Sequence, residues 1–140
     1  MSEINTQKIL DGITRAISAE WPQSQIFDDE IEHGLRPGDF NVILVTSSQQ
    51  QIVGERYKRT PLFDVLYYPK NGREDCYKVA DTLSLLLNVI SLTEGDLLRG
   101  TGLDFEVVDG VLHFYVRYTH FVRRGEIGDP METLEIKQGG

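Results

Sequence analysis

The 140-residue chain contains a single cysteine, Cys76, and only three histidines. One cysteine excludes an internal disulfide and any zinc site built from several cysteines. The histidines occur in separate contexts, at His33, His113 and His120, and the last two would fall on opposite faces of a regular strand. We therefore expect no metal site and no cofactor.

Long apolar runs are also missing. No run approaches the roughly 18–20 residues that are needed to span a bilayer. The N-terminal residues MSEINTQKIL lack the basic segment and apolar stretch of a secretory signal. We expect a soluble protein that is made in a reducing cytosol and has no membrane contact.

Positive charge is scarce, because 14 basic residues stand against 22 acidic ones and give a net charge of −8. Nonspecific binding of duplex nucleic acid needs a clustered positive surface, which this balance disfavours. The 40% of apolar residues and 26% of charged residues describe an ordinary globular protein. The length suits one domain.

Catalytic motifs of the common kinds are absent: there is no GxSxG, no HExxH and no glycine-rich phosphate loop. Carboxylates do cluster between Asp28 and Glu32, and such a cluster could serve acid/base chemistry or bind a hard cation. In a strand Asp28, Glu30 and Glu32 would share one face and repel one another unless solvated. We interpret them as a wet acidic face and a candidate partner surface, with an acid/base enzyme as an alternative.

The first half of the chain predicts one helix followed by three strands. Apolar residues at three- and four-residue steps predict a helix over 3–21, which Pro22 ends. A short strand is expected over 25–33. The segments 40–53 and 55–68 then form a long hairpin whose distal part, about 46–60, is polar and basic and cannot bury much of itself.

The second half predicts a helix and a final hairpin. Asn71 is the expected N-cap of a helix that runs to about Leu92, with Glu74 completing a variant of the capping box. The helix stripe includes Cys76, which we interpret as a core thiol. Pro61, which cannot donate to a ladder, marks an edge, bulge or bend in the preceding strand.

Asp109-Gly110 is a strong hairpin sequence because a type I′ turn needs positive φ at both positions. A two-residue loop fixes the pairing of the strands 103–108 and 111–124, and every apolar residue of the first meets an apolar residue of the second. The predicted pairs are Val108 with Val111, Val107 with Leu112, Phe105 with Phe114, and Leu103 with Val116.

The strand 111–124 is predicted to have two different faces. The buried face comprises Leu112, Phe114, Val116, Tyr118 and Val122. The other comprises His113, Tyr115, Arg117, Thr119, Phe121 and Arg123. This aromatic and basic face could stack nucleobases, as sheet-based single-stranded RNA-binding modules do, or it could contact another strand, helix or subunit.

The order of predicted elements is α-β-β-β-α-β-β. This order predicts a single α+β domain, residues 1–124, with an antiparallel-rich mixed sheet, two helices on one face and a protruding hairpin arm. We expect residues 125–140 to form a mobile tail.

The run Arg56-Tyr57-Lys58-Arg59 is a clustered positive patch. Arginine and tyrosine are enriched at subunit interfaces, and an acidic neighbour would suit them. A basic arm and an acidic face on one chain indicate head-to-tail self-association, which can close into a ring. The candidate interface residues are Arg56, Tyr57, Arg59, Tyr115 and Arg117.

These segments together resemble the tail terminator (tail completion) proteins of long-tailed bacteriophages and prophages. The resemblance rests on the N-terminal amphipathic helix, the acidic IFDDEIEHG stretch and the GERYKR arm, followed by FDVLYYP, a helix and a final hairpin ending in FYVRYTHFVRR. It covers the chain to about residue 124.

The resemblance implies a structural, non-enzymatic virion protein that assembles as a ring, of six copies in this family, on the head-proximal end of the tail tube. Its partners would be itself, the tail tube protein and the head–tail connector, and DNA would pass through without specific binding. Asp28, Glu30 and Glu32 would then line the lumen or face a partner. Another head–tail joining or minor capsid protein is the structural alternative.

Overall fold

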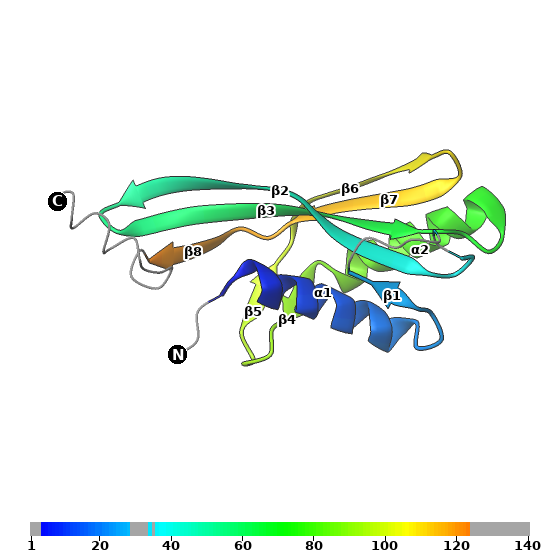
Figure 1. Ribbon diagram of the computed structural model, residues 1–140, viewed down its shortest axis with the longest axis horizontal. Coiled ribbons are helices and arrows are strands. Elements are labelled where there is room, and N and C mark those ends of the chain that lie inside the picture. The colour runs from blue at the N-terminus through cyan, green and yellow to red at the C-terminus, as the bar shows by residue number, and fades with distance from the viewer. Residues whose placement is uncertain (1–3, 29–33, 35, 124–140) are drawn as a thin grey trace.

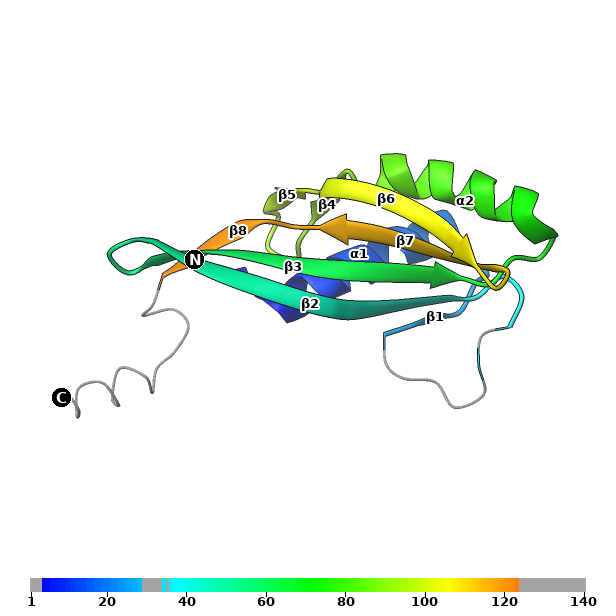
Figure 2. The same cartoon turned by 90° about the horizontal axis from the view of Figure 1, so that it is seen from above.

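The computed structural model describes residues 4–28, 34 and 36–123. Two helices pack against one mostly antiparallel mixed sheet, and a two-stranded sheet lies beside them (Figure 1). The main sheet has the strand order β1-β2-β3-β7-β6, with β8 added along the outer part of β3 (Figure 2). The α+β class predicted from the sequence is confirmed.

Helix α1 spans Thr6–Glu20 and begins where the Asn5 side chain accepts a hydrogen bond from the Lys8 backbone N–H at 2.8 Å. Its buried stripe includes Ile9, Ile13 and Ile17. Gly12 lies on the same stripe, and a Cβ there would stand 3.3 Å from the backbone oxygen of Ser91. The glycine therefore lets α1 approach the small sheet closely, which accounts for its place inside a helix.

The main sheet begins with a parallel pair and continues with antiparallel ones. β1, Ile26–Phe27, runs parallel to the start of β2, Phe40–Val53, which forms a hairpin with β3, Arg56–Tyr67. The strand expected over 25–33 is seen at Ile26–Phe27, and its later part, residues 29–33, lies outside the described residues.

The strand predicted over 111–124 is two strands, a correction to the sequence prediction. β7 covers Val111–Arg117 and β8 covers His120–Arg123, and both pair with β3. The break lies opposite Pro61, whose carbonyl accepts a hydrogen bond from the Tyr118 N–H at 3.2 Å. Pro61 has no N–H to return, so the ladder is interrupted there. The alternation of buried side chains nevertheless continues through the break, and all five predicted inner residues are buried.

Helix α2, Gly72–Leu86, is shorter than predicted, and its last residues are replaced by the hairpin of β4, Val89–Ser91, and β5, Leu97–Arg99. The helix ends where the Leu87 carbonyl accepts a hydrogen bond from the Tyr118 hydroxyl at 2.6 Å. Ile90 stays buried in the new conformation. Burial at this position therefore does not distinguish a helix from a strand.

The hairpin of β6, Thr101–Val108, and β7 has the predicted register at Val108–Val111, Val107–Leu112 and Phe105–Phe114. Asp109 and Gly110 have φ values of 52° and 78°, as a type I′ turn requires. A register shift between Thr101 and Asp104 removes the predicted pairing of Leu103 with Val116.

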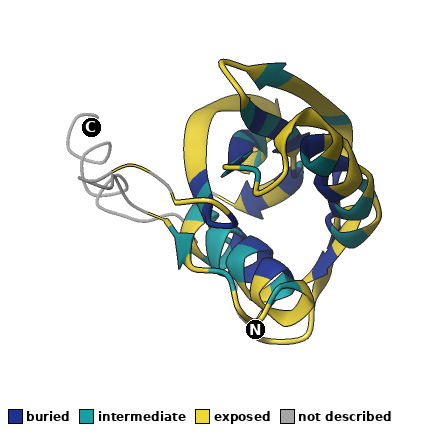
Figure 3. Ribbon diagram, turned by 90° about the vertical axis from the view of Figure 1, so that its right-hand side faces the viewer, coloured by how far each residue is buried: buried dark blue, intermediate teal, exposed yellow. Residues whose placement is uncertain are grey.

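The core lies between the helices and one face of the sheet, as the burial colouring shows (Figure 3). Among the described residues, no helix covers the opposite face of the sheet. We call it the uncovered face. By strand alternation its residues include Asn41, Ile43, Thr46, Ser48, Gln50, Arg56, Lys58, Leu62, Asp64, Leu66, Asp104, Glu106, His113, Tyr115, Arg117, Phe121 and Arg123.

Candidate subunit interface

The β2–β3 hairpin extends well past both helices (Figure 1). From Ile43 onward every residue of β2 is exposed. The far part of β3 pairs with β8, so the arm is three-stranded over Arg56–Arg59. An exposed, ordered arm of this kind is available to contact another molecule.

The end of the arm is basic and carries an exposed aromatic ring. Arg56 lies with its guanidinium carbon 5.3 Å from the centre of the Phe121 ring, a cation–π geometry, and Phe121 is half exposed. Arg56 pairs with Arg123, and Lys58 pairs with Phe121. Three cationic side chains and one ring thus share the uncovered face at this end.

The two other predicted arm residues belong to the opposite face. Arg59 donates from Nε and Nη2 to the Gln49 side-chain oxygen at 3.1 and 2.8 Å, which fixes the guanidinium across the hairpin. Tyr57 is half-buried and pairs with Gln51 on one side and Val122 on the other. The structure therefore brings the three residues close together in β3. Arg56 lies on the uncovered face, and Tyr57 and Arg59 lie on the opposite face.

The middle of the uncovered face holds a buried carboxylate. Asp64 in β3 lies 2.8 Å from Nδ1 of His113 in β7. Burial raises the pKa of Asp64, and the hydrogen bond and charge of His113 oppose that rise. Asp64 is only 6% exposed. The sequence did not indicate this burial, because Asp64 alternates with apolar residues as a solvated strand position does.

Tyr115 and Arg117 lie on β7 in the same face. The Tyr115 hydroxyl donates to Glu106 at 2.9 Å, and desolvation together with this bond raises the pKa of Tyr115 to about 12. The Tyr115 and His113 rings stack with their centres 6.3 Å apart. Arg117 is exposed and pairs with Leu62 of β3, three positions from Arg59.

The two ends of the uncovered face differ in charge. Asp64, Glu106 and Asp104 lie in its middle and toward β6, whereas Arg56, Lys58 and Arg123 lie at the arm. The carboxylates would repel a phosphate backbone next to the aromatic rings that could have stacked on bases. This arrangement disfavours the RNA-binding alternative.

Of the predicted acidic face, Asp28 is exposed and directly follows β1, while Glu30 and Glu32 lie outside the described residues. β1 pairs with Phe40 and Asn41, at the end of β2 remote from the arm. The 14 residues from Phe40 to Val53 span about 40 Å of strand. Asp28 and the basic arm are thus at opposite ends of the sheet.

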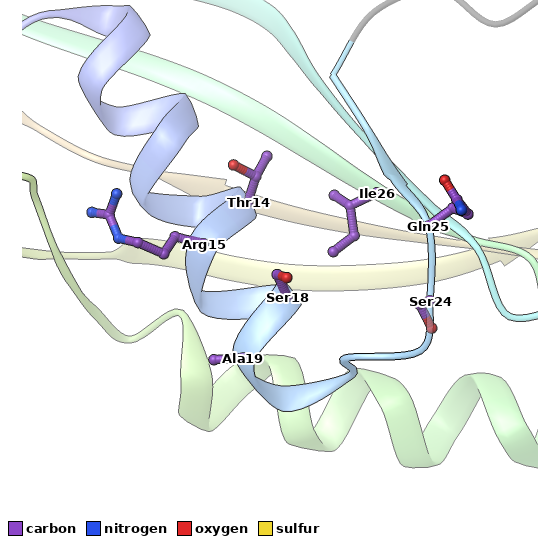
Figure 4. A pocket seen from close by; sticks show the side chains of 7 residues that line it. All are labelled: Thr14, Arg15, Ser18, Ala19, Ser24, Gln25 and Ile26. Carbon is purple, nitrogen blue, oxygen red and sulfur yellow. The ribbon is translucent and has the colours of Figure 1, made fainter.

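An open groove of about 550 Å³ lies between α1 and the segment that carries β1 (Figure 4). Its α1 wall includes Thr14 and Ser18, and its other wall includes Ser24 and Ile26. Arg15 at its rim donates to the Ser91 carbonyl at 2.7 Å. The lining is shallow and mixed, without a cluster of titratable side chains among the described residues.

Sequence patterns missed three features of this surface. The Asp64–His113 pair depends on the diagonal register of β3 and β7, which pattern alone does not supply. The exposed apolar residues Ile43, Leu44 and Val45 look like a buried strand in the sequence. The contact of Arg56 with Phe121 depends on β8 pairing with β3.

Within the described residues, no helix is both long and apolar enough to cross a membrane. None of the curated proteins compared with the chain matches it. The sequence model of a family described as phage tail terminator protein matches residues 8–130, which is most of the chain. The match includes all of α1 except its first two residues, the whole of α2 and all the described strands. The chain therefore belongs to the phage tail terminator family, whose members are structural virion assembly proteins that complete the phage tail.

Proposed function

We propose that the protein caps the phage tail tube as a ring of identical copies, ends tube polymerisation and forms the joint to the head–neck complex. In this proposal the ring sits at the head-proximal end of the tail, and the resemblance to tail terminators supports a size of six copies. Membership of the tail terminator family supports a role in tail completion.

The observation that carries the ring is the exposed arm. Residues of the distal hairpin bury little against their own chain, although the hairpin is regular and long. Ordering such an arm gains little hydrophobic stabilisation unless a neighbour covers it. Arg56, Tyr57 and Arg59 on the arm, with Tyr115 and Arg117 beside it, are the proposed contacts between copies.

Charge supports the same arrangement. The basic arm and Asp28 lie at opposite ends of one subunit, so neighbouring copies can meet head to tail, which is the arrangement that closes into a ring. A chain with a net charge of −8 also suits a lumen that passes DNA without binding it. Asp28, Glu30 and Glu32 are proposed for that lumen or for a partner face.

Residues 1–124 form the assembling unit, with the arm at about 46–60. Residues 125–140, of which the structure describes none, supply a further contact to the tube protein or connector.

Polymerisation of the cognate tail tube protein tests the capping activity. Substoichiometric addition of this protein should shorten the tubes and leave a ring density at one end in negative-stain images. Charge reversal of the arm, in Arg56→Glu/Arg59→Glu, should abolish both effects, while Arg73→Glu on α2 should preserve them. Tubes of unchanged length with bare ends would refute capping.

A further inference from the structure

The edge of β2 that faces away from β3 is open along most of its length. β1 pairs only with Phe40 and Asn41. Beyond Asn41, no strand among the described residues lies along this side of β2. The sequence from Val42 to Val53, VILVTSSQQQIV, contains no charged residue and no proline.

The backbone groups along this edge can be assigned. The Phe40 N–H donates to the Gln25 carbonyl, so it points toward β1 and away from β3. Farther along, Ser47 pairs with Pro61, whose carbonyl points to Tyr118 on the other side. In an antiparallel ladder such a pair exchanges no hydrogen bonds. Ser47, and by alternation Gln49 and Gln51, therefore direct their N–H and C=O groups to the open edge.

Natural sheets guard edges of this kind with charges, prolines, bulges or a covering segment. β2 has bulges only near Val45 and Ile52. Between them Thr46–Gln51 is a regular, unguarded strand. The opposite edge of the sheet, β6, has a matching regular run at Asp104–Val108, bounded by a register shift on one side and the Asp109-Gly110 turn on the other.

Strand direction decides how the two edges could meet. β2, β3, β7 and β6 alternate in direction across the sheet. When a copy is rotated about a ring axis to the next position, its β2 therefore runs antiparallel to the β6 beside it. A β2–β6 contact joins different surfaces of two copies, which is the heterologous contact that a ring requires.

We propose that the open edge of β2, at Thr46–Gln51, pairs in antiparallel fashion with β6, at Asp104–Val108, of a second copy of this chain. The proposal rests on the proposed ring and names its subunit contact. The main sheet then continues from one copy to the next, with main-chain hydrogen bonds across each junction.

Charges on the uncovered face fit this junction. Lys58 pairs with Gln50 and so lies one strand in from the β2 edge. Asp104 and Glu106 of the neighbouring copy lie on β6 itself and on the same face. Lys58 would then lie near two carboxylates of the neighbouring copy, with only β2 between them. This attraction favours the pairing of β2 with β6 over the pairing of two β2 edges or of two β6 edges.

The geometry of closed sheets gives the same contact. Four strands are about 19 Å wide, and at the 35–45° tilt of closed barrels neighbouring copies are displaced by about 13–19 Å, or about four to six residues, along the strands. Asp104 is level with Ile43 in its own copy. Because Val45 is an extra residue in the bulge of β2, that displacement brings Asp104 opposite about residues 48–50 of the next copy. A displacement in the other direction would bring Asp104 toward Phe40 and Asn41, where β1 already occupies this edge of β2.

Disulfide trapping tests the junction, because Cys76 is the protein's only cysteine and is fully buried. Cysteine is introduced by Asp104→Cys together with Thr46→Cys, Ser48→Cys or Gln50→Cys, all on the uncovered face. Within one copy the two edges are separated by β3 and β7, about 14 Å, which exceeds the reach of a disulfide. Any disulfide between the two positions therefore joins two copies.

At least one double variant should give a cross-linked ladder that extends beyond the dimer on a non-reducing gel and collapses on reduction. Each single-cysteine variant is its control and should remain monomeric on that gel. A ladder confined to dimers, or dimers from Ser48→Cys alone, would mean that β2 pairs with β2 and would overturn the proposal.

Native mass spectrometry of the unaltered protein separates the two claims. Rings without any ladder overturn the β2–β6 junction and leave the proposed function standing. Monomers alone, with and without tube protein, overturn both.

Discussion

Tyr118 shows how one side chain holds two parts of the fold together. It is fully buried in the break between β7 and β8, and its hydroxyl donates to the Leu87 carbonyl at the end of α2. Burial raises the pKa of Tyr118 well above its usual range, so the phenol stays protonated and can donate this bond. The bond connects the end of α2 to the break between β7 and β8.

Removing that hydroxyl should leave the Leu87 carbonyl without its donor. Tyr118→Phe is expected to lower the free energy of unfolding by about 1–3 kcal/mol. Urea unfolding followed by the fluorescence of Trp21, the only tryptophan, measures the change. Tyr77→Phe on the exposed side of α2 is the control and should unfold as the unaltered protein does. Equal stability of the two variants would contradict the role assigned to Tyr118.

Asp64 gives a prediction for pH. Its pKa is raised in the folded protein by burial, so the folded state keeps a proton that the unfolded state has already lost. Stability therefore falls as the pH rises from about 4 toward the folded pKa. Asp64→Asn removes this penalty, and its stability relative to the unaltered protein should increase over that window.

Urea unfolding at several pH values between 4 and 7 checks this sign. Asp81→Asn, which alters an exposed carboxylate on α2, should give a profile parallel to that of the unaltered protein. A parallel profile for Asp64→Asn as well would show that burial of the carboxylate does not govern its titration.

At the scale of elements, the start of α2 shows the limit of capping rules. Asn71 is the N-cap residue as predicted, but its side chain makes no capping hydrogen bond. Instead, Asp75 accepts hydrogen bonds from the Lys70 N–H and the Tyr67 hydroxyl, both at 2.7 Å. Partial burial alone would raise the pKa of Asp75, but these hydrogen bonds lower it.

Asp75→Ala should therefore destabilise the protein at pH 7 by about 1.5–3 kcal/mol, the range for hydrogen bonds to a charged group. Because the folded pKa is lowered, the contribution of Asp75 should be lost as the pH falls below about 4. Glu74→Ala, at the expected capping-box position, should cost much less at either pH. Thermal unfolding followed by circular dichroism compares the two variants. A larger loss of stability for Glu74→Ala would show that the capping box, and not Asp75, stabilises the start of α2.

Local patterns predicted the elements that depend on local chemistry. The β6–β7 turn needs positive φ at Asp109 and Gly110, and the sequence supplies residues that tolerate it. The end of α2 was not predictable, since Ile90 is buried as a strand residue just as it would be in a helix. The break between β7 and β8 was not predictable either, because it is imposed by Pro61 on a neighbouring strand.

The candidate interface divides in the same way. The basic run at Arg56–Arg59 is contiguous in the sequence and was found there. Its ring partner Phe121 and the buried carboxylate Asp64 depend on which strands pair. The sequence therefore did not predict contacts between side chains that only the pairing of the strands brings together.

At the scale of the whole molecule, charge at the arm should control assembly separately from folding. Arg56→Glu/Arg59→Glu should raise at least tenfold the protein concentration at which rings form, equivalent to about 1.4 kcal/mol, and change the thermal midpoint little. Sedimentation velocity across a concentration series measures the first and calorimetry the second. Arg36→Glu/Arg73→Glu carries the same charge change away from the arm and should assemble normally; equal loss in both variants would make the effect one of net charge.

Native mass spectrometry of the unaltered protein at high concentration tests whether copies of this chain close into a ring. We predict one closed species at six times the monomer mass, formed by the protein alone or on addition of tail tube protein. Only monomers under both conditions would contradict a ring of identical copies.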